Sequence, residues 1–368
     1  MFNISAYLLA PAMRAPTSAQ GLVLLIVASS DAVSPPSSHV ACGRWPTLFV
    51  LGVQKAGTTT LSASLMRHAN ILTNTTVGTA ATLASSACCS HAMQANNITD
   101  SSENPSNRMC HGFTNGWPKE THFWQWCLRG RRQLCAAYPA LFPRYGDAFA
   151  VDMTPEYISD PQVPSALAAL YPRGLQRSAR FIVMLREPVA RMFSAYKHYA
   201  RAGWLANPTM SFDAWSQVEL SVYRGYSTVE EAEADFVQAD LVSSKMPNLA
   251  RGFYALSLQQ WRAYWPRRQI LVLNFHEVFS AGGEQTAREL LGQFIGLHSA
   301  LAPFTHANSD PLSSSSQIGC NTSAQLQQVY APHNLALLEM LAVDESPVGD
   351  APSVEPFFVA FPPAPDCD

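Results

Sequence analysis

The chain has 368 residues, of which 48% are hydrophobic and 10% aromatic. This content is sufficient for one large folded core and excludes a disordered chain or a small scaffold held together by disulfides. The formal net charge is −3, from 24 basic and 27 acidic residues, which argues against a nucleic-acid binder that works by bulk positive charge.

The N-terminal region, residues 1–44, is predicted to be a signal peptide or signal anchor followed by a stem. Its longest apolar run, residues 21–28, is short for crossing a bilayer but fits the apolar centre of a signal peptide. A Pro/Ser stretch at residues 34–38 then indicates a linker. The alternative is a buried N-terminal segment or a misassigned gene start.

Sequons and cysteines favour the secretory pathway. Four Asn-x-Ser/Thr sequons occur, at Asn3, Asn74, Asn97 and Asn321. The cysteines form an even set of eight: Cys42, Cys88, Cys89, Cys110, Cys127, Cys135, Cys320 and Cys367. In an oxidising compartment such a set predicts disulfides. The Cys/His clusters at residues 88–91 and 110–111 match no standard zinc spacing, so no metal is expected.

Strand and helix patterns alternate along the rest of the chain. Short apolar runs predict buried strands at residues 47–53, 148–153, 181–185 and 270–275. Helical patterns lie at residues 59–68, 188–202 and 254–264. This alternation predicts a single α/β domain whose central, mostly parallel sheet is flanked by helices and carries a P-loop-like phosphate-binding loop.

The predicted domain spans residues 45–342. Residues 73–116 interrupt it with Ser, Thr, Asn, Ala and cysteine, which is typical of an inserted loop tied in part by disulfides. Residues 343–368 form a Pro-rich, acidic tail.

The first predicted strand runs into a small-residue turn and a helix, with the sequence GVQKAGTTTL at residues 52–61. Backbone N–H groups at a helix N-terminus, with the positive end of the helix dipole behind them, form an anion site. An NTPase loop would place lysine after the second glycine, whereas here Lys55 lies inside the loop and Thr58 follows Gly57. The pattern therefore predicts an anion site and argues against an ordinary ATPase or nucleoside kinase; the alternative is a plain glycine turn.

A second candidate anion contact follows the strand at residues 181–185. Arg186 lies at the predicted carboxyl end of this strand, the edge where open α/β sheets bind ligands. Ser194 lies within the first two turns of the next helix, which Pro188 begins. A guanidinium and a hydroxyl are a natural pair for a phosphate. The alternative is a surface Arg–Glu pair beside a helix-facing serine.

The segment WPKETHFW, residues 117–124, supplies an acid/base candidate. A carboxylate beside an aromatic wall can serve as a general base for a hydroxyl, and Glu120 has that setting. Lys119 and His122 are predicted to bind the acceptor. The alternative is a solvated Lys/Glu turn next to core aromatic residues.

In this order the three segments resemble the sulfotransferases that use 3′-phosphoadenosine 5′-phosphosulfate (PAPS), in particular the Golgi carbohydrate branch that includes the heparan sulfate sulfotransferases. GVQKAGTTTL looks like the loop that binds the donor's 5′-phosphosulfate, and LREPVARMFSAY looks like the 3′-phosphate motif. KETHFW is similar to the segment that carries the catalytic glutamate. Further matches lie at residues 152–157, 252–254, 261, 269–279 and 330–334.

The resemblance implies in-line transfer of a sulfuryl group to an acceptor hydroxyl or amine, without a metal. By motif position, Glu120 would deprotonate the acceptor and Lys55 would stabilise the charge that develops on the donor oxygens. The residues that would hold the 5′-phosphosulfate are Lys55, Ala56, Gly57, Thr58 and Thr59. Arg186 and Ser194 would bind the 3′-phosphate, and Thr154 and Pro155 would contact the acceptor.

The chain departs from the heparan sulfate enzymes at two places. Those enzymes commonly carry a lysine in a Glu-Lys-Thr/Ser-Pro segment, where this chain has Met153. They also have a lysine-rich loop between cysteines that helps to clasp the donor, whereas residues 309–323 contain Cys320 alone and no basic residue. Either backbone amides and hydroxyls around Gly319 clasp the donor, or the donor is held more loosely.

We therefore expect a PAPS-dependent carbohydrate sulfotransferase of the secretory pathway, in the Golgi lumen, with either a single-pass type II membrane anchor or a cleaved signal. Its expected partner is a glycan or another hydroxylated acceptor, and no nucleic acid. No lysine or arginine follows Arg288, so a neutral glycan or a small hydroxylated metabolite is as credible an acceptor as a polyanion. A nucleotide-dependent kinase and a catalytically silent glycan-binding relative are the competing hypotheses.

Overall fold

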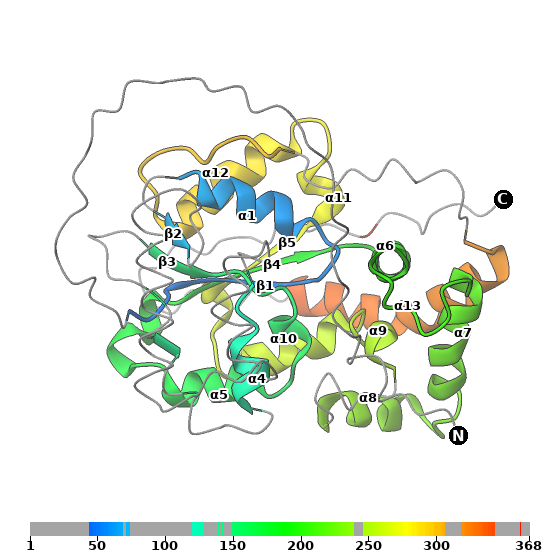
Figure 1. Ribbon diagram of the computed structural model, residues 1–368. Coiled ribbons are helices and arrows are strands. Elements are labelled where there is room, and N and C mark those ends of the chain that lie inside the picture. Colours follow the sequence, from blue (N-terminus) through cyan, green and yellow to red (C-terminus); the bar gives the residue numbers. More distant parts are fainter. Residues whose placement is uncertain are drawn as a thin grey trace, which may run out of the picture.

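A parallel β-sheet lies between two layers of helices (Figure 1). The computed structural model describes residues 44–68, 71–73, 120–128, 135, 138–139, 142, 149–238, 246–305, 318–342 and 361. The strands are β1 Leu48–Gly52, β2 Ile71–Thr73, β3 Phe149–Asp152, β4 Arg180–Leu185 and β5 Ile270–Asn274. Their order across the sheet is β2–β3–β1–β4–β5, and each neighbouring pair is parallel. The predicted α/β class with its central parallel sheet is confirmed.

The strands are mostly apolar because helices cover both faces of the sheet, and polar residues such as Arg180, Asp152 and Asn274 stand at strand ends. All residues of β1 and β5 are buried, as expected for a parallel sheet. In the register between β1 and β4, Phe49 stacks on Phe181 with ring centroids 5.1 Å apart. The four predicted strands are present. The edge strand β2 was not predicted, because three residues carry too little pattern.

Helices cover both faces of the sheet, and a further group of helices lies beside it (Figure 1). The upper layer in that view holds α1 Thr58–Met66, α11 Phe275–Val278 and α12 Gly283–Ile295. The lower layer holds α4 Phe123–Leu128, α5 Val163–Leu170 and α10 Tyr254–Arg262. The side group consists of α6 Pro188–Ala202, α7 Phe212–Tyr223, α8 Val229–Gln238, α9 Pro247–Ala250 and α13 Cys320–Ala342. Short 3-10 turns lie at Tyr157–Ser159, Arg173–Ser178 and Arg267–Gln269.

Local capping explains why α6 matches its predicted bounds. Pro188 stands at its first turn, and the Glu187 carboxylate accepts hydrogen bonds from Val189 N at 3.0 Å and Ala190 N at 2.6 Å. Gly203 ends the helix in the left-handed conformation, with φ of 69°. Both signals can be read in the sequence.

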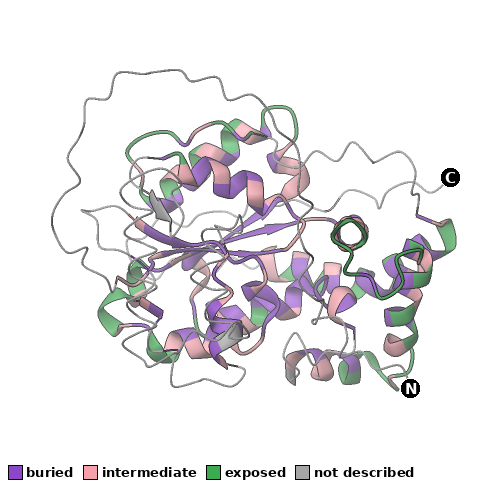
Figure 2. Ribbon diagram, in the orientation of Figure 1, coloured by how far each residue is buried: buried purple, intermediate pink, exposed green. Residues whose placement is uncertain are grey.

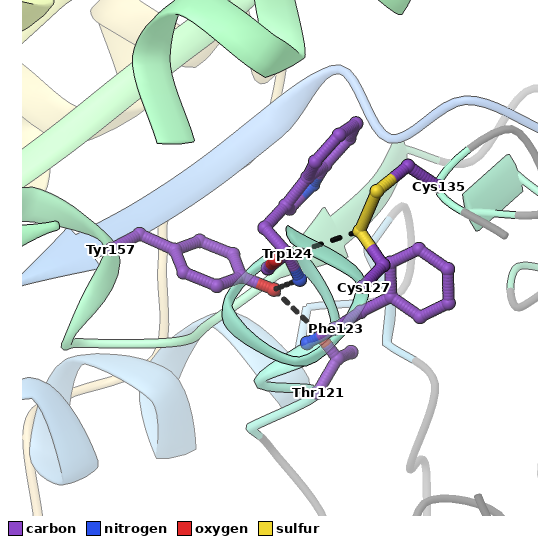
Figure 3. Close-up of a disulfide and its surroundings, with 6 residues drawn as sticks. All are labelled: Thr121, Phe123, Trp124, Cys127, Cys135 and Tyr157. Carbon is purple, nitrogen blue, oxygen red and sulfur yellow. Dashed lines mark hydrogen bonds between the residues drawn. A yellow bond between two sulfur atoms is a disulfide. The ribbon is translucent and has the colours of Figure 1, made fainter. Parts of the chain in front are cut away.

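A disulfide ties α4 to the segment that follows it (Figure 3). Cys127 and Cys135 are bonded, and both side chains are buried. Cys320, at the start of α13, is disulfide-bonded as well. The other cysteines, three of the four sequons, residues 1–43 and nearly all of the 73–116 and 343–368 segments lie outside the described residues. Within the described part, no helix is long and apolar enough to cross a membrane.

Candidate active site

The predicted anion loop connects β1 to α1 at the carboxyl edge of the sheet. Lys55 has a φ of 72° and Gly57, at the N-cap of α1, a φ of 82°. A Cβ on Gly57 would lie 3.0 Å from the rings of Phe275 and Phe279. Glycine is therefore required there by both conformation and space. The turn leaves the first N–H groups of α1 without helical partners, which is what an anion needs.

The segment after β3 packs directly on the start of this loop. A Cβ on Gly52 would lie 2.3 Å from the Pro155 carbonyl oxygen and 2.5 Å from Ile158 Cγ2. Only a hydrogen atom fits in that space. The close approach brings residues 152–157 beside the loop, which agrees with their shared place at the carboxyl edge of neighbouring parallel strands.

Arg186 lies at the carboxyl end of β4 and faces the loop. Its Nη1 donates to the Lys55 carbonyl oxygen at 3.2 Å, and its guanidinium lies 4.8 Å from the centre of the Phe275 ring. Its Nε is buried and has no hydrogen-bond partner among the described residues. Burial lowers the pKa of Arg186. A buried guanidinium with an unsatisfied donor favours an anionic ligand. Ser194 is partly exposed on the second turn of α6.

Glu120 and His122 form a charged pair at the start of α4. His122 Nε2 lies 3.2 Å from Glu120 Oε2, and the Glu120 side chain is 15% exposed. The other ring nitrogen, Nδ1, lies 3.1 Å from Gln125 Oε1 and 3.4 Å from Glu156 Oε2. All of these partners are acceptors, so both ring nitrogens donate and the imidazole is a cation. Glu120 then stands as a carboxylate that has a cationic neighbour.

The protonated state of His122 also follows from its surroundings. Burial on its own would lower the pKa of His122, but the hydrogen bond to Glu120 and the charge of Glu156 outweigh burial and raise the pKa to about 9. At neutral pH His122 is therefore charged.

A buried arginine connects this pair to the anion loop. Arg251 Nη2 donates to Glu156 Oε1 at 3.0 Å, and its Nη1 donates to Gln54 Oε1 at 2.9 Å and to the Tyr199 hydroxyl at 2.7 Å. Gln54 also donates to Glu156 Oε1 at 3.1 Å. A continuous network thus runs from Glu120 through His122, Glu156 and Arg251 to the residue that precedes Lys55.

Asp152, at the end of β3, supports the segment that contains Glu120. Its fully buried carboxylate accepts hydrogen bonds from four hydroxyls, those of Tyr138, Thr154, Thr121 and Tyr157, at 2.5, 2.7, 3.0 and 3.2 Å. The Tyr157 hydroxyl also contacts Thr121 Oγ1 and Trp124 N (Figure 3). Burial raises the pKa of Asp152, and the four hydroxyls that donate to it act in the opposite direction. The cluster fixes the backbone that follows Glu120.

The structure places the remaining predicted residues as follows. Thr154 is fully buried and its Oγ1 also accepts from Thr121 N at 3.0 Å, so it positions the Glu120 segment. Lys119 lies outside the described residues. Gly319 N donates to Asp213 Oδ1 at 3.2 Å, so this amide already has a protein partner. The proposed acceptor and donor contacts of these residues stay predictions.

Sequence reasoning missed His198, Glu156 and Arg251 as site residues. His198 lies on α6 one turn after Ser194 and is partly buried. Burial lowers the pKa of His198, the positive charges of Lys55 and Arg201 lower it further, and the charges of Glu120 and Glu156 oppose them. His198 thus lies within electrostatic reach of Lys55 and Glu120. The four-residue spacing from Ser194 was the only sequence signal for it.

Residues 46–309 match the family model of the sulfotransferase domain. The chain belongs to the sulfotransferase family. As the family resemblance implied, it is an enzyme of sulfuryl transfer, and the loop, Arg186 and Glu120 lie within the matched region.

The curated relatives are large bifunctional enzymes. The chain is 24% identical over 266 residues to the mouse (Mus musculus) bifunctional heparan sulfate N-deacetylase/N-sulfotransferase 2 and 24% identical over 264 residues to its bovine (Bos taurus) counterpart. Each alignment covers 71% of this chain but only 23% of the relative. Among solved structures, a sulfotransferase from Alicyclobacillus acidocaldarius is 20% identical with a TM-score of 0.49, covering 82% of this chain and 97% of that one.

Proposed function

We propose that this sulfotransferase transfers the sulfuryl group of PAPS to a hydroxyl or amine of a carbohydrate acceptor, with Glu120 as general base and Lys55 stabilising the transferring group. The observation that carries the proposal is the hydrogen-bonded network from Glu120 to Gln54. It supports placing the base and the anion loop in one preorganised unit, which is the arrangement that group transfer between two bound substrates requires.

The donor-side residues have the chemistry that PAPS demands. PAPS carries a 5′-phosphosulfate and a 3′-phosphate. For the 5′-phosphosulfate the loop offers backbone N–H groups and the hydroxyls of Thr58 and Thr59. The unsatisfied Nε of Arg186 and the Ser194 hydroxyl, on the second turn of α6, suit the 3′-phosphate. Within the described residues, no cluster of His, Cys, Asp and Glu could hold a metal ion.

The proposed reaction is a single displacement at the donor sulfur. The Glu120 carboxylate takes the proton from the acceptor O–H or N–H, and the freed lone pair forms a bond to the donor sulfur. The bond from sulfur to the bridging oxygen breaks, and 3′-phosphoadenosine 5′-phosphate leaves with that electron pair. Lys55 stabilises the negative charge that develops on the bridging and phosphate oxygens. His122 holds Glu120 in place before the acceptor binds.

A carbohydrate acceptor is favoured by the relatives, whose name describes N-sulfotransfer to heparan sulfate. A small hydroxylated metabolite is the second candidate, because the chain lacks lysine and arginine after Arg288. A location in the Golgi lumen belongs to the same proposal. The buried Cys127–Cys135 disulfide and the exposed sequon residue Asn321 support an oxidising, glycosylating compartment.

The test is transfer of labelled sulfate from PAPS to a panel of glycans and small hydroxyl compounds. Glu120→Gln and Lys55→Ala should each lower turnover by about a hundredfold or more, the effect expected for losing a base or a charge stabiliser. Glu289→Gln and Arg173→Ala, substitutions elsewhere on the surface, are the matched controls and should leave turnover unchanged. Wild-type turnover with small compounds alone would overturn the carbohydrate acceptor, and no transfer to any compound would support a silent relative.

A further inference from the structure

An exposed tryptophan follows α6 next to the site. After Gly203 ends the helix, Trp204 N donates to the Tyr199 carbonyl oxygen at 2.9 Å, which fixes the backbone at this position. The Trp204 side chain is nevertheless 37% exposed. The chain between α6 and α7 is largely exposed (Figure 2). Tryptophan is enriched at binding interfaces, because its side chain offers a large apolar surface together with one N–H donor.

Two rings that reach the site hold the indole in place. The Trp204 ring lies edge-on to His198, with centroids 5.4 Å apart and an interplanar angle of 84°. The Tyr199 ring packs on the same indole with ring centroids 6.0 Å apart, and its hydroxyl donates to Gln54 Oε1 in the anion loop at 2.9 Å. The indole of Trp204 is therefore held in a fixed orientation, and the side chains that hold it connect it to the site.

The ring of His198, which contacts Trp204, is a polar group on which the charges of the site act. His198 lies in the combined field of Lys55, Glu120 and Glu156. An acceptor that extends from Glu120 across His198 to Trp204 would meet hydrogen-bonding and charged groups first and one apolar surface at its far end. A flat aromatic metabolite needs apolar walls around it, whereas a pyranose ring has hydroxyls at its edge and an apolar C–H face. The arrangement fits the sugar better.

We propose that Trp204 is the acceptor-binding platform on which a sugar ring stacks, neighbouring the sugar that Glu120 deprotonates. This inference rests on the proposed function, because it assumes a carbohydrate acceptor. It makes Trp204 a determinant of acceptor specificity that takes no part in the chemical step or in donor binding.

The test compares steady-state kinetics of the full chain and its Trp204 variants. The acceptors are oligosaccharides of heparosan, chondroitin and chitin, with 4-nitrophenol as the aromatic probe, and the glycan with the highest wild-type turnover is used. Trp204→Ala should raise the acceptor KM about tenfold and leave kcat and the KM for PAPS within about twofold of wild type. Trp204→Phe keeps a ring and should restore most of the affinity. Tyr264→Ala removes an aromatic side chain that is 51% exposed elsewhere and is the matched control.

The outcomes separate the two proposals. If wild type sulfates no glycan, the proposed carbohydrate function fails. If wild type sulfates a glycan but Trp204→Ala keeps the wild-type acceptor KM, or Trp204→Phe is as impaired as Trp204→Ala, the platform is wrong while the proposed function stands. Loss of PAPS affinity in Trp204→Ala would equally overturn the inference, because it would show a general effect on the fold.

Discussion

The charge on His122 gives the most specific prediction for stability. His122 donates to Glu120 and faces Glu156, and its pKa is raised to about 9 from an ordinary value of 6.5. The full difference would amount to about 3 kcal/mol of stability. The side chain is 36% exposed, so solvent screening leaves about 1–2 kcal/mol.

The sign of the pH dependence follows from the direction of the shift. A raised pKa in the folded state means that the contribution is complete below about pH 6.5 and disappears as pH rises through about 9. His122→Asn should therefore be less stable than wild type by about 1–2 kcal/mol at pH 6 and nearly equal to it at about pH 10.

Urea unfolding of both proteins at these two pH values measures the difference. Thr305→Ala, a change in an exposed side chain away from the pair, is the control and should show no such pH dependence. A stability difference between wild type and His122→Asn that is the same at both pH values would refute the cationic state of His122.

Three other substitutions test the donor loop and its supports. Arg186→Ala should weaken PAPS binding, measured by calorimetry, by about tenfold or more, and unchanged affinity would remove Arg186 from the donor site. Gly57→Ala should weaken PAPS binding and lower stability by about 1–2 kcal/mol, because φ is 82° and two phenylalanine rings fill the space; a fully stable variant with wild-type affinity would contradict this. Asp152→Asn should cost about 2–3 kcal/mol in urea unfolding, since the four hydroxyls would lose their carboxylate, and a loss below about 0.5 kcal/mol would show that the cluster is not structural.

Local signals explain what could be predicted from the sequence. The four longer strands are buried on both faces, so each contains a short apolar run, and α6 carries its own start and stop signals in Pro188 and Gly203. The anion loop was recognisable because its glycine spacing and small residues are local as well. The three-residue β2 carries no comparable pattern.

The supports of the site depend on contacts between distant residues. Arg251 meets Glu156 across 95 positions and Gln54 across 197, and no local spacing indicates either contact. His122 was predicted as an acceptor contact, whereas in the structure both of its ring nitrogens face protein groups. Sequence patterns identified the residue types of the site, and only the fold shows which of them hold Glu120 in place.

Transfer of labelled sulfate in a single turnover tests the central claim most directly. Wild type and Glu120→Gln are each saturated with PAPS, verified by calorimetry, and mixed with the best glycan of the panel. We predict that Glu120→Gln binds PAPS as wild type does and transfers sulfate at least about a hundredfold more slowly. Equal transfer rates at equal donor occupancy would contradict the role of Glu120 as the base.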